Sequence, residues 1–397
     1  MDSKYIDLLL KRCLSFDKSK SLLISYNKLN KDFVDLLVNE AYSMGIDDIY
    51  REEIDEYYKH DLLKKSSIDE IKENDYFKAI IWDEYAKKDA AFLFIESEIP
   101  GLMDDIEPEK IALSSYIRRT TKPVYNKKRD NGTLSWCIAA YPNELWAKDI
   151  FGDTLDAYDK LKDVIFKMCM IDTLNPIESW NKFLTETDKR VQKLNQMHIN
   201  KLHYKNSLGT DLLITLPDNS LWCSASEDNR IVNMPSYEVF TSPDYLKTEG
   251  IVYASLPLMH NGVLIKDFYI EFKNGKVINY DAKEGREVLK GIIESDPNAC
   301  FLGECALVNN DSPISNTGLI FKTTLFDENA SCHLALGAGF SECLEGGLKM
   351  SEEELLKNGI NQSKNHVDFM IGTKDMHIDA IVGDKTITIF ENGNFVI

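Results

Sequence analysis

The chain has 397 residues, more than one hydrophobic core usually organises, so its length predicts two domains. Apolar residues make up 44% and aromatic residues 10% of the sequence, which excludes an intrinsically disordered chain. The formal net charge of −19 disfavours contact with phosphate backbones, so we expect no nucleic-acid partner. The charge favours solubility, and an attraction for cationic ligands such as a free α-amine is the alternative reason for it.

The N-terminal residues and the cysteines predict a cytoplasmic protein. Residues 1–17 contain neither a long apolar run nor a small-residue cleavage site, so we expect no signal peptide. No stretch reaches the ~18 apolar residues of a membrane span, and we expect no membrane association. The eight cysteines are scattered without a CxxC pair, which indicates reduced thiols rather than disulfides or zinc–thiolate ligation.

Strand and helix patterns alternate over residues 1–175. Short apolar runs typical of buried strands occur at Ser21–Tyr26, Asp47–Arg51, Ala90–Glu96 and Trp136–Tyr141. Helical patterns follow at Asp32–Met44, Pro108–Thr120 and Thr154–Met170. The alternation predicts an α/β N-terminal domain with a mostly parallel sheet and helices on both faces. The absence of a GxGxxG or P-loop motif gives no sign of nucleotide binding.

Residues 176–397 read as a β-rich α+β domain. Pro176–Asn200 is typical of one long polar helix that links the halves. Asn274-Gly275 and Asn392-Gly393 predict hairpin turns, and Ala282–Ser295 predicts a helix. Period-two patterns predict strands at Thr210–Leu216, Leu221–Ser224, Gly250–Leu256, Asp267–Phe272, Val277–Asp281, Ala299–Val308, His377–Val382, Thr386–Glu391 and Asn394–Ile397. We expect these strands to form a curled sheet or a barrel that carries the functional site.

Candidate site residues concentrate between Thr324 and Asp368. In the run His366–Asp368, an imidazole and a carboxylate would share one face of a strand, either as metal ligands or as a buried hydrogen-bonded pair. Glu328 and His333 bracket the sequence NASC, between the strand-like FKTTLF and the Gly-rich LGAGF; Glu328 would be a ligand or the partner of one. The run His377–Asp379 repeats the spacing, but its polar approach indicates a solvated strand start.

Two further acids lie within apolar sequence. Glu304 lies between CFLG and CALV, where a carboxylate is costly to bury unless it is paired or ligated. No basic residue lies nearby in sequence, which favours a metal ligand over a salt bridge. Gly303 predicts a bulge or a close backbone approach at this point. Glu238 lies in YEVF, between Pro235 and Pro243, and would be a ligand or an exposed acid of an edge strand.

Together these residues predict a carboxylate-rich centre with imidazole ligands. Such donors suit zinc, cobalt, manganese or magnesium. Two such ions, ~3.5–4 Å apart, would share a carboxylate and a water that attacks a scissile carbonyl. The predicted metal ligands are Glu238, Glu304, Glu328, His333, His366 and Asp368.

The surrounding motifs resemble the thermophilic-type metallo-aminopeptidases, the group of aminopeptidase T and aminopeptidase S. The motifs are NMPSYEVFTSPD, LGECALV, TLFDENASCHLALG and MSEEELLKNGINQSKNHVDFMIG, in family order, and weaker similarity covers the rest of the chain. The resemblance implies a homodimeric exopeptidase that binds two divalent ions (Zn, Co, Mg or Mn) per chain and removes N-terminal residues from peptides with a free N-terminus. It also implies that Glu304 lies between the two ions and is catalytic.

The chain departs from this family at Phe340, where the family has a catalytic tyrosine seven residues after the first motif histidine. Phenylalanine cannot donate a hydrogen bond to a tetrahedral intermediate, and the loss of one such donor typically lowers the rate about a hundred- to a thousandfold. The metal ions or Tyr237 could replace that donor in an active aminopeptidase. The alternatives are a catalytically weakened or non-catalytic homologue that binds metal or peptide, and a dipeptidase-like amide hydrolase.

Overall fold

The computed structural model describes residues 1–397 except 17–20, 74–75, 228–229 and 261. The chain folds into two units, one of Met1–Lys182 with Ala225–Pro235 and one of Phe183–Ser224 with Ser236–Ile397. The division falls within α10 (Pro176–Met197), the long helix that the sequence predicts. The sequence predicts a domain boundary between residues 175 and 176. That boundary stays a prediction.

The first unit is an α/β unit built on a parallel sheet with the strand order β10-β4-β3-β1-β2. Its strands are β1 (Ser21–Asn27), β2 (Asp48–Ile54), β3 (Ala91–Glu96), β4 (Ser135–Ala140) and β10 (Asn233–Met234), with a separate β8–β9 pair (Ser226–Glu227 and Arg230–Ile231). Its helices are α1 (Asp2–Asp7), α2 (Lys31–Ser43), α3 (Glu56–Lys65), α4 (Ile68–Glu73), α5 (Tyr76–Lys87), α6 (Pro108–Thr120), α7 (Pro123–Asp130), α8 (Glu144–Phe151) and α9 (Ala157–Met168).

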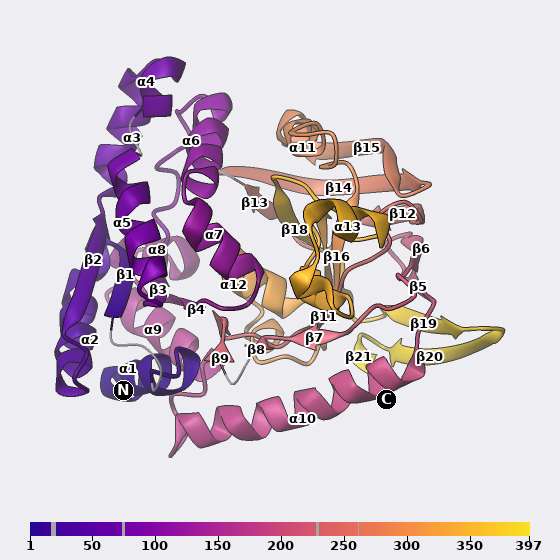
Figure 1. Ribbon diagram of the computed structural model, residues 1–397, viewed down its shortest axis with the longest axis horizontal. Helices are drawn as coiled ribbons and strands as arrows, with labels where there is room; N and C mark the ends of the chain where they lie inside the picture. The colour runs from indigo at the N-terminus through magenta and orange to yellow at the C-terminus, as the bar shows by residue number, and fades with distance from the viewer. Residues whose placement is uncertain (17–20, 74–75, 228–229, 261) are drawn as a thin grey trace. The chain divides into compact units, whose positions relative to one another are not determined.

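Packing on both faces explains why these strands read as continuous apolar runs. Leu23 of β1 and Phe92 of β3 pack against Trp82 of α5 and Tyr125 of α7. Leu22, on the opposite face of β1, is also fully buried. Helices flank the sheet in Figure 1. Strands buried on both faces carry apolar residues at successive positions, so the predicted parallel sheet is confirmed.

The second unit contains two larger antiparallel sheets. One, which we call the site sheet, has the order β18-β17-β16-β11-β7. The other has the order β13-β14-β12-β6-β5-β19-β20-β21, with β15 paired to β14. Among the residues that the structure describes, the end strands β13 and β21 do not pair with each other, so the sheet is open and the barrel alternative was wrong. The strands are β5 (Lys201–Lys205), β6 (Asp211–Thr215), β7 (Cys223–Ser224), β11 (Val239–Thr241), β12 (Glu249–Tyr253), β13 (Leu258–His260), β14 (Val263–Lys273), β15 (Lys276–Glu284), β16 (Leu302–Leu307), β17 (His333–Gly337), β18 (His366–Met370), β19 (His377–Val382), β20 (Lys385–Glu391) and β21 (Asn394–Phe395).

One face of the site sheet forms part of the core of this unit. Leu334 and Leu336 of β17 and Val367 and Phe369 of β18 are buried in a single apolar cluster with residues of the larger sheet, such as Ile378. Because side chains alternate across a strand, the residues between them point to the other face. The core therefore holds the strands that carry the predicted ligands.

Turn residues account for both predicted hairpins. Asn274 and Gly275 join β14 to β15 with φ values of 50° and 75°, and Asn392 and Gly393 join β20 to β21 with φ values of 50° and 72°. Two successive positive φ values are the requirement of a type I′ turn, which Asn-Gly meets with little strain. Both hairpin predictions are confirmed.

Two local predictions were wrong. The helix expected over 282–295 is shorter, because β15 continues to Glu284 and Gly285, with φ of 77°, separates it from α11 (Arg286–Ile293). The strand-like run FKTTLF contains the start of α12 (Thr324–Asp327), and the strand of this region is β17, which begins at His333.

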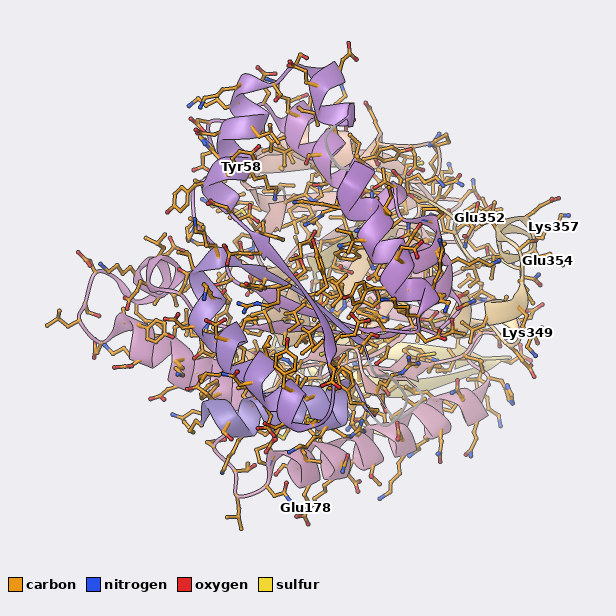
Figure 2. The ribbon with its side chains drawn as sticks, turned by 60° about the vertical axis from the view of Figure 1, so that its left-hand side comes forward. Tyr58, Glu178, Lys349, Glu352, Glu354 and Lys357 are labelled. Carbon is orange, nitrogen blue, oxygen red and sulfur yellow. The ribbon has the colours of Figure 1, made fainter. Side chains whose placement is uncertain are left out.

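Charged side chains are exposed on α13 (Glu352–Lys357), near the C-terminal end of the chain. Glu352, Glu354 and Lys357 of α13 are exposed and project away from the ribbon (Figure 2). All eight cysteines lie in the described part of the chain and are free thiols. Among the described residues, no helix is both long and apolar enough to cross a membrane.

Candidate metal centre

Neighbouring strands of the site sheet bring the predicted ligands together. Glu304 lies on β16, His333 on β17, and His366 and Asp368 on β18; Glu238 directly precedes β11. The pairing of β16 and β17 with β18 sets Glu304 opposite Ala335, which is in turn opposite Asp368. Residues paired in this way share a face. The ligands therefore converge on the face opposite the core.

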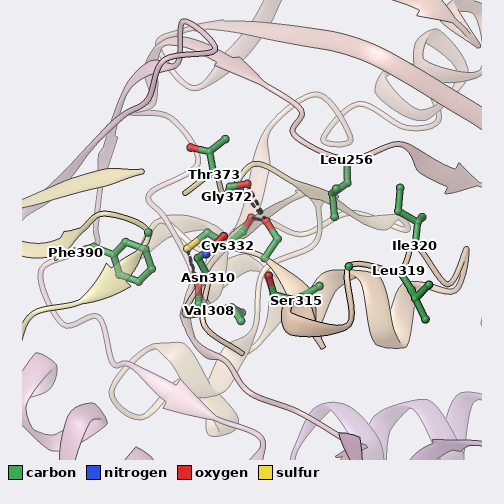
Figure 3. Close-up of a pocket in the computed structure, with 14 residues that line it drawn as sticks. Leu256, Val308, Asn310, Ser315, Leu319, Ile320, Cys332, Gly372, Thr373 and Phe390 are labelled. Atoms are coloured by element: carbon green, nitrogen blue, oxygen red, sulfur yellow. Dashed lines mark hydrogen bonds between the residues drawn. The ribbon is translucent and has the colours of Figure 1, made fainter. Parts of the chain in front are cut away.

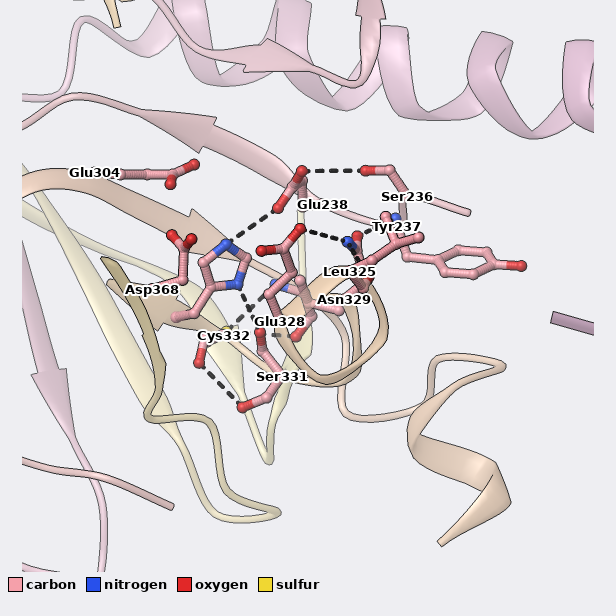
Figure 4. Close-up of polar contacts among 12 residues, drawn as sticks. Ser236, Tyr237, Glu238, Glu304, Leu325, Glu328, Asn329, Ser331, Cys332 and Asp368 are labelled. Atoms are coloured by element: carbon pink, nitrogen blue, oxygen red, sulfur yellow. Dashed lines mark hydrogen bonds and ion pairs between the residues drawn. The ribbon is translucent and has the colours of Figure 1, made fainter. Parts of the chain in front are cut away.

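The converging atoms form two groups that share Glu304. Glu238, Glu304 and His333 make one group, and Glu304, His366 and Asp368 make the other; within each, the potential ligand atoms lie within 4.8 Å of one another. His333 Nε2 is 3.1 Å from a Glu238 oxygen, and His366 Nε2 is 3.2 Å from Glu304 and 3.3 Å from Asp368. Figure 4 shows the carboxylates of this centre directed toward one another.

Backbone carbonyls fix the orientation of both imidazoles. His333 Nδ1 lies 3.0 Å from the carbonyl of Ser331, and His366 Nδ1 lies 2.8 Å from the carbonyl of Ala338. A carbonyl only accepts, so each Nδ1 carries a proton and each Nε2 is directed at the acids of the centre. This is the arrangement commonly found for metal-binding histidines.

Gly303 lets the Ala338 carbonyl, which contacts His366, lie close to β16. The register between β16 and β17 shifts between Leu302 and Glu304, as the predicted bulge requires. A Cβ at position 303 would collide with the backbone oxygen of Ala338. The glycine therefore lets the Ala338 backbone approach β16, and the same carbonyl orients His366. The sequence predicted a bulge or a close backbone approach at Gly303, and the structure has both.

The electrostatics of the centre are those of crowded acids. Burial raises the pKa of Glu304 to about 7. Burial and then the charges of Asp368 and Glu238 raise the pKa of Glu328 well above its usual value. Burial alone would lower the pKa of His333, but the hydrogen bond and charge of Glu238 outweigh it and raise that pKa well above its usual value. Burial alone would raise the pKa of Asp368, but the charge of His366 outweighs it and lowers that pKa to about 2. Glu304 and Glu328 are therefore the acids of this centre that retain a proton most readily.

The donor set fits divalent cations. Within the described residues, the ion pairs of Glu238, Glu304 and Asp368 involve only histidines, and no lysine or arginine neutralises them. The side chains between the ligands on this face are small, because alanines occupy positions 306 and 335. Buried acids without a lysine or arginine partner, beside imidazoles whose Nε2 atoms are directed inward, are the donors that zinc, cobalt or manganese bind.

Glu328 lies beside this centre but belongs to neither group. It is 8% exposed, and its carboxylate accepts a hydrogen bond of 3.3 Å from the Asn329 amide. Asn329 is fully buried and also accepts the Tyr237 backbone N–H at 2.8 Å. Ser236 donates to Glu238 at 3.1 Å. The sequence reasoning missed Asn329 and Ser236; their positions beside Glu328 and Glu238 were the available signal.

Phe340 lies at the edge of the centre. Its ring centroid is 4.9 Å from that of His366 and 5.2 Å from that of Phe240, and its backbone N–H donates to Ser242 at 2.9 Å. Tyr237 does not take the place of a tyrosine there. Its ring packs edge-on against Phe183 at 5.1 Å, and its hydroxyl points away from the carboxylates in Figure 4.

The two histidine–aspartate repeats provide a matched test of the site. His377 contacts Asp379 on its own strand, β19, at 3.1 Å, and belongs to neither ligand group of the described chain. We expect His366→Ala to release metal and lower kcat at least about a hundredfold, because the remaining ligands are incomplete. His377→Ala should change kcat less than about twofold, since solvated surface substitutions have small effects. Both kcat and metal content are measured for each variant. Equal losses of kcat and metal in His366→Ala and His377→Ala would contradict the assignment of His366 as a ligand.

Another cavity of this unit is separate from the centre. It has a volume of about 250 Å³, and Leu256, Val308, Leu319, Cys332 and Phe390 contribute to its lining (Figure 3). None of the predicted ligands lines it, and none of its lining side chains is charged. It therefore lacks the acids and imidazoles that would hold a metal ion.

Comparison with known proteins agrees with the chemistry of the centre. The chain is 35% identical to aminopeptidase PepS of Streptococcus thermophilus, over 99% of this chain and 97% of the relative. It is 35% identical to aminopeptidase AmpS of Bacillus subtilis (strain 168), over 98% of this chain and 97% of the relative. The solved structure of wild-type AmpT from Thermus thermophilus superposes with a TM-score of 0.90 at 28% identity, covering 100% of this chain and 99% of that one. The model of the thermophilic metalloprotease family (M29) matches residues 2–395, and the chain belongs to that family.

Proposed function

We propose that this protein is a two-metal aminopeptidase that removes N-terminal residues from peptides. The observation that carries the proposal is the pair of ligand groups that share Glu304 in a member of a metalloprotease family. A carboxylate common to two groups is the arrangement needed to hold two ions close together. The names of the relatives as aminopeptidases support the choice of peptide substrates.

The proposed roles follow from the positions of the side chains. Glu238 and His333 would hold one ion, His366 and Asp368 the other, and Glu304 both. Ions bound there would make a water nucleophilic near neutral pH and polarise the scissile carbonyl. The carbonyls of Ser331 and Ala338 keep the imidazoles oriented.

We assign Glu328 to proton transfer rather than ligation. It is buried beside the centre yet lies outside both ligand groups, so its carboxylate remains available when the others are bound. A carboxylate in that position can accept the proton of the attacking water and deliver it to the leaving amine. Asn329, whose amide contacts Glu328, would hold its carboxylate in place.

The proposed setting is a cytoplasmic homodimer that acts on peptides with a free N-terminus. Free thiols at all eight cysteines support a reducing compartment. The free α-amine of a peptide would be attracted by the acids of the centre. The dimer rests on the family resemblance, and the mass of the assembly in solution tests it.

Hydrolysis and metal dependence test the function together. Protein supplied with zinc or cobalt should release leucine from a leucyl chromogenic amide, and a chelator should abolish the release. The chelated protein should also unfold at a lower temperature, because bound ions stabilise the native state by mass action and relieve repulsion among the acids. Re-addition of metal should restore both properties. Chelated protein with unchanged activity would rule out the metal mechanism.

The alternatives are distinguished by substrate length and by metal binding without turnover. A dipeptidase-like hydrolase would cleave dipeptides and lose rate on tetrapeptides of the same N-terminal residue, whereas an aminopeptidase should cleave both. The replacement of the family tyrosine by Phe340 favours the second alternative, a homologue that binds metal or peptide without efficient turnover. Binding of two ions together with no hydrolysis of any peptide would support it.

A further inference from the structure

An apolar side chain borders the candidate metal centre at one end. His366, Asp368 and Met370 occupy alternate positions of β18, so their side chains leave the strand on the same face. Met370 is paired with His333 across β17. The ligand-bearing face thus continues directly into a thioether.

A small cavity opens at this end of the centre. Asp368 and Met370 line it together with Leu258 and Met259 of β13 and with Thr323 and Thr324. Leu258, Met370 and Thr323 are buried, whereas Met259 is partly exposed and Thr324 is exposed. The cavity therefore joins a member of the metal centre to residues that reach solvent.

The two acids in the wall of this cavity, Asp327 and Asp368, are engaged by other groups of the protein. The two oxygens of Asp327 accept the backbone N–H groups of Phe321 and Lys322, each at 2.8 Å. Asp368 faces His366 and belongs to a ligand group. The surfaces that remain are thioether, leucine and threonine, which suit an uncharged group.

We infer that this cavity receives the side chain of the substrate's N-terminal residue and selects short, uncharged side chains, with Met259 limiting their length. The inference rests on the proposed aminopeptidase function, because a residue whose amine and carbonyl lie at the centre must direct its side chain to an adjoining surface. The cavity volume is about 10 Å³. That volume holds roughly one water-sized group, which is also the size of a methyl.

Met259 is the residue through which the cavity can be enlarged. It is only partly buried, on a short strand, so its truncation leaves the core of the unit intact. Methionine has several rotatable bonds and can move aside, but a longer substrate side chain must displace it. Alanine should therefore be the preferred N-terminal residue, leucine should follow, and phenylalanine and lysine should be poor.

The test compares tripeptides that differ only in the N-terminal residue, alanine, leucine, phenylalanine or lysine. Met259→Ala should raise kcat/KM for phenylalanine relative to alanine about tenfold or more, since each methylene of fit changes such ratios by that order. Met259→Phe should shift the ratio in the opposite direction. Met350→Ala, a methionine outside the cavity, should match the wild type. Lysine should stay poor in every variant.

The outcomes separate the inference from the function on which it rests. Wild-type hydrolysis of the alanine peptide together with unchanged ratios in both Met259 variants overturns the inference and leaves the aminopeptidase proposal standing. Cleavage of the lysine peptide as fast as the alanine peptide also overturns it. No hydrolysis of any peptide by the metal-loaded wild type overturns both.

Discussion

Glu304→Gln is expected to remove both metal binding and hydrolysis. Glu304 is the residue common to the two ligand groups, so its neutralisation weakens both sites at once. The loss of metal-based charge stabilisation, roughly 4 kcal/mol, corresponds to a fall in kcat of about a thousandfold. Metal content measured by elemental analysis should fall from two ions per chain to less than one, alongside the loss of leucine release. Retention of two ions would show that another group bridges them.

Glu328→Gln provides the matched control. It changes a buried acid of the same type beside the same centre, but one outside both ligand groups. We expect it to keep two ions and to lose kcat about a hundred- to ten-thousandfold, the usual contribution of general acid–base catalysis. A variant that instead loses one ion would reassign Glu328 as a ligand. Glu352→Gln, on the exposed face of α13, should behave as wild type in both measurements.

The sequence predicts most of the fold because local patterns determine it. The parallel strands of the first unit are buried on both faces and read as apolar runs, while the hairpins follow from Asn-Gly pairs that tolerate positive φ. At the site, His366 and Asp368 share a face because they are two residues apart on a strand. The isolation of Glu304 among apolar residues correctly predicted a buried acid. Each of these inferences needed only neighbouring residues.

The remainder depends on contacts between distant parts of the chain. The segment Ala225–Pro235 returns to the first unit through the pairing of β10 with β4, which no local pattern signals. The run LGAGF looks like a loop because of its glycines, yet its first residues end β17. The carbonyl of Ala338 that orients His366 lies 28 positions earlier in the chain. Such partners become visible only once the strands are assembled.

The environment of Phe340 decides what a hydroxyl at that position can do. The ring lies against His366, a member of the metal centre, and is partly exposed, so one added oxygen need not be forced into a closed core. The backbone is held independently of the ring by the hydrogen bond to Ser242. A tyrosine should therefore keep the same backbone position while it gains a donor near the reacting groups.

Phe340→Tyr is accordingly expected to raise kcat about ten- to a hundredfold, with KM nearly unchanged. A donor that contacts only the tetrahedral intermediate lowers the barrier without tightening substrate binding. Phe240→Tyr adds the same hydroxyl to the neighbouring ring, 5.2 Å away, and should give no such gain. An active wild type whose kcat does not rise in Phe340→Tyr would mean that the ions alone stabilise the oxyanion. If the wild type and Phe340→Tyr both bind two ions but hydrolyse no peptide, the chain is instead a binding protein. In that case the added donor does not restore catalysis.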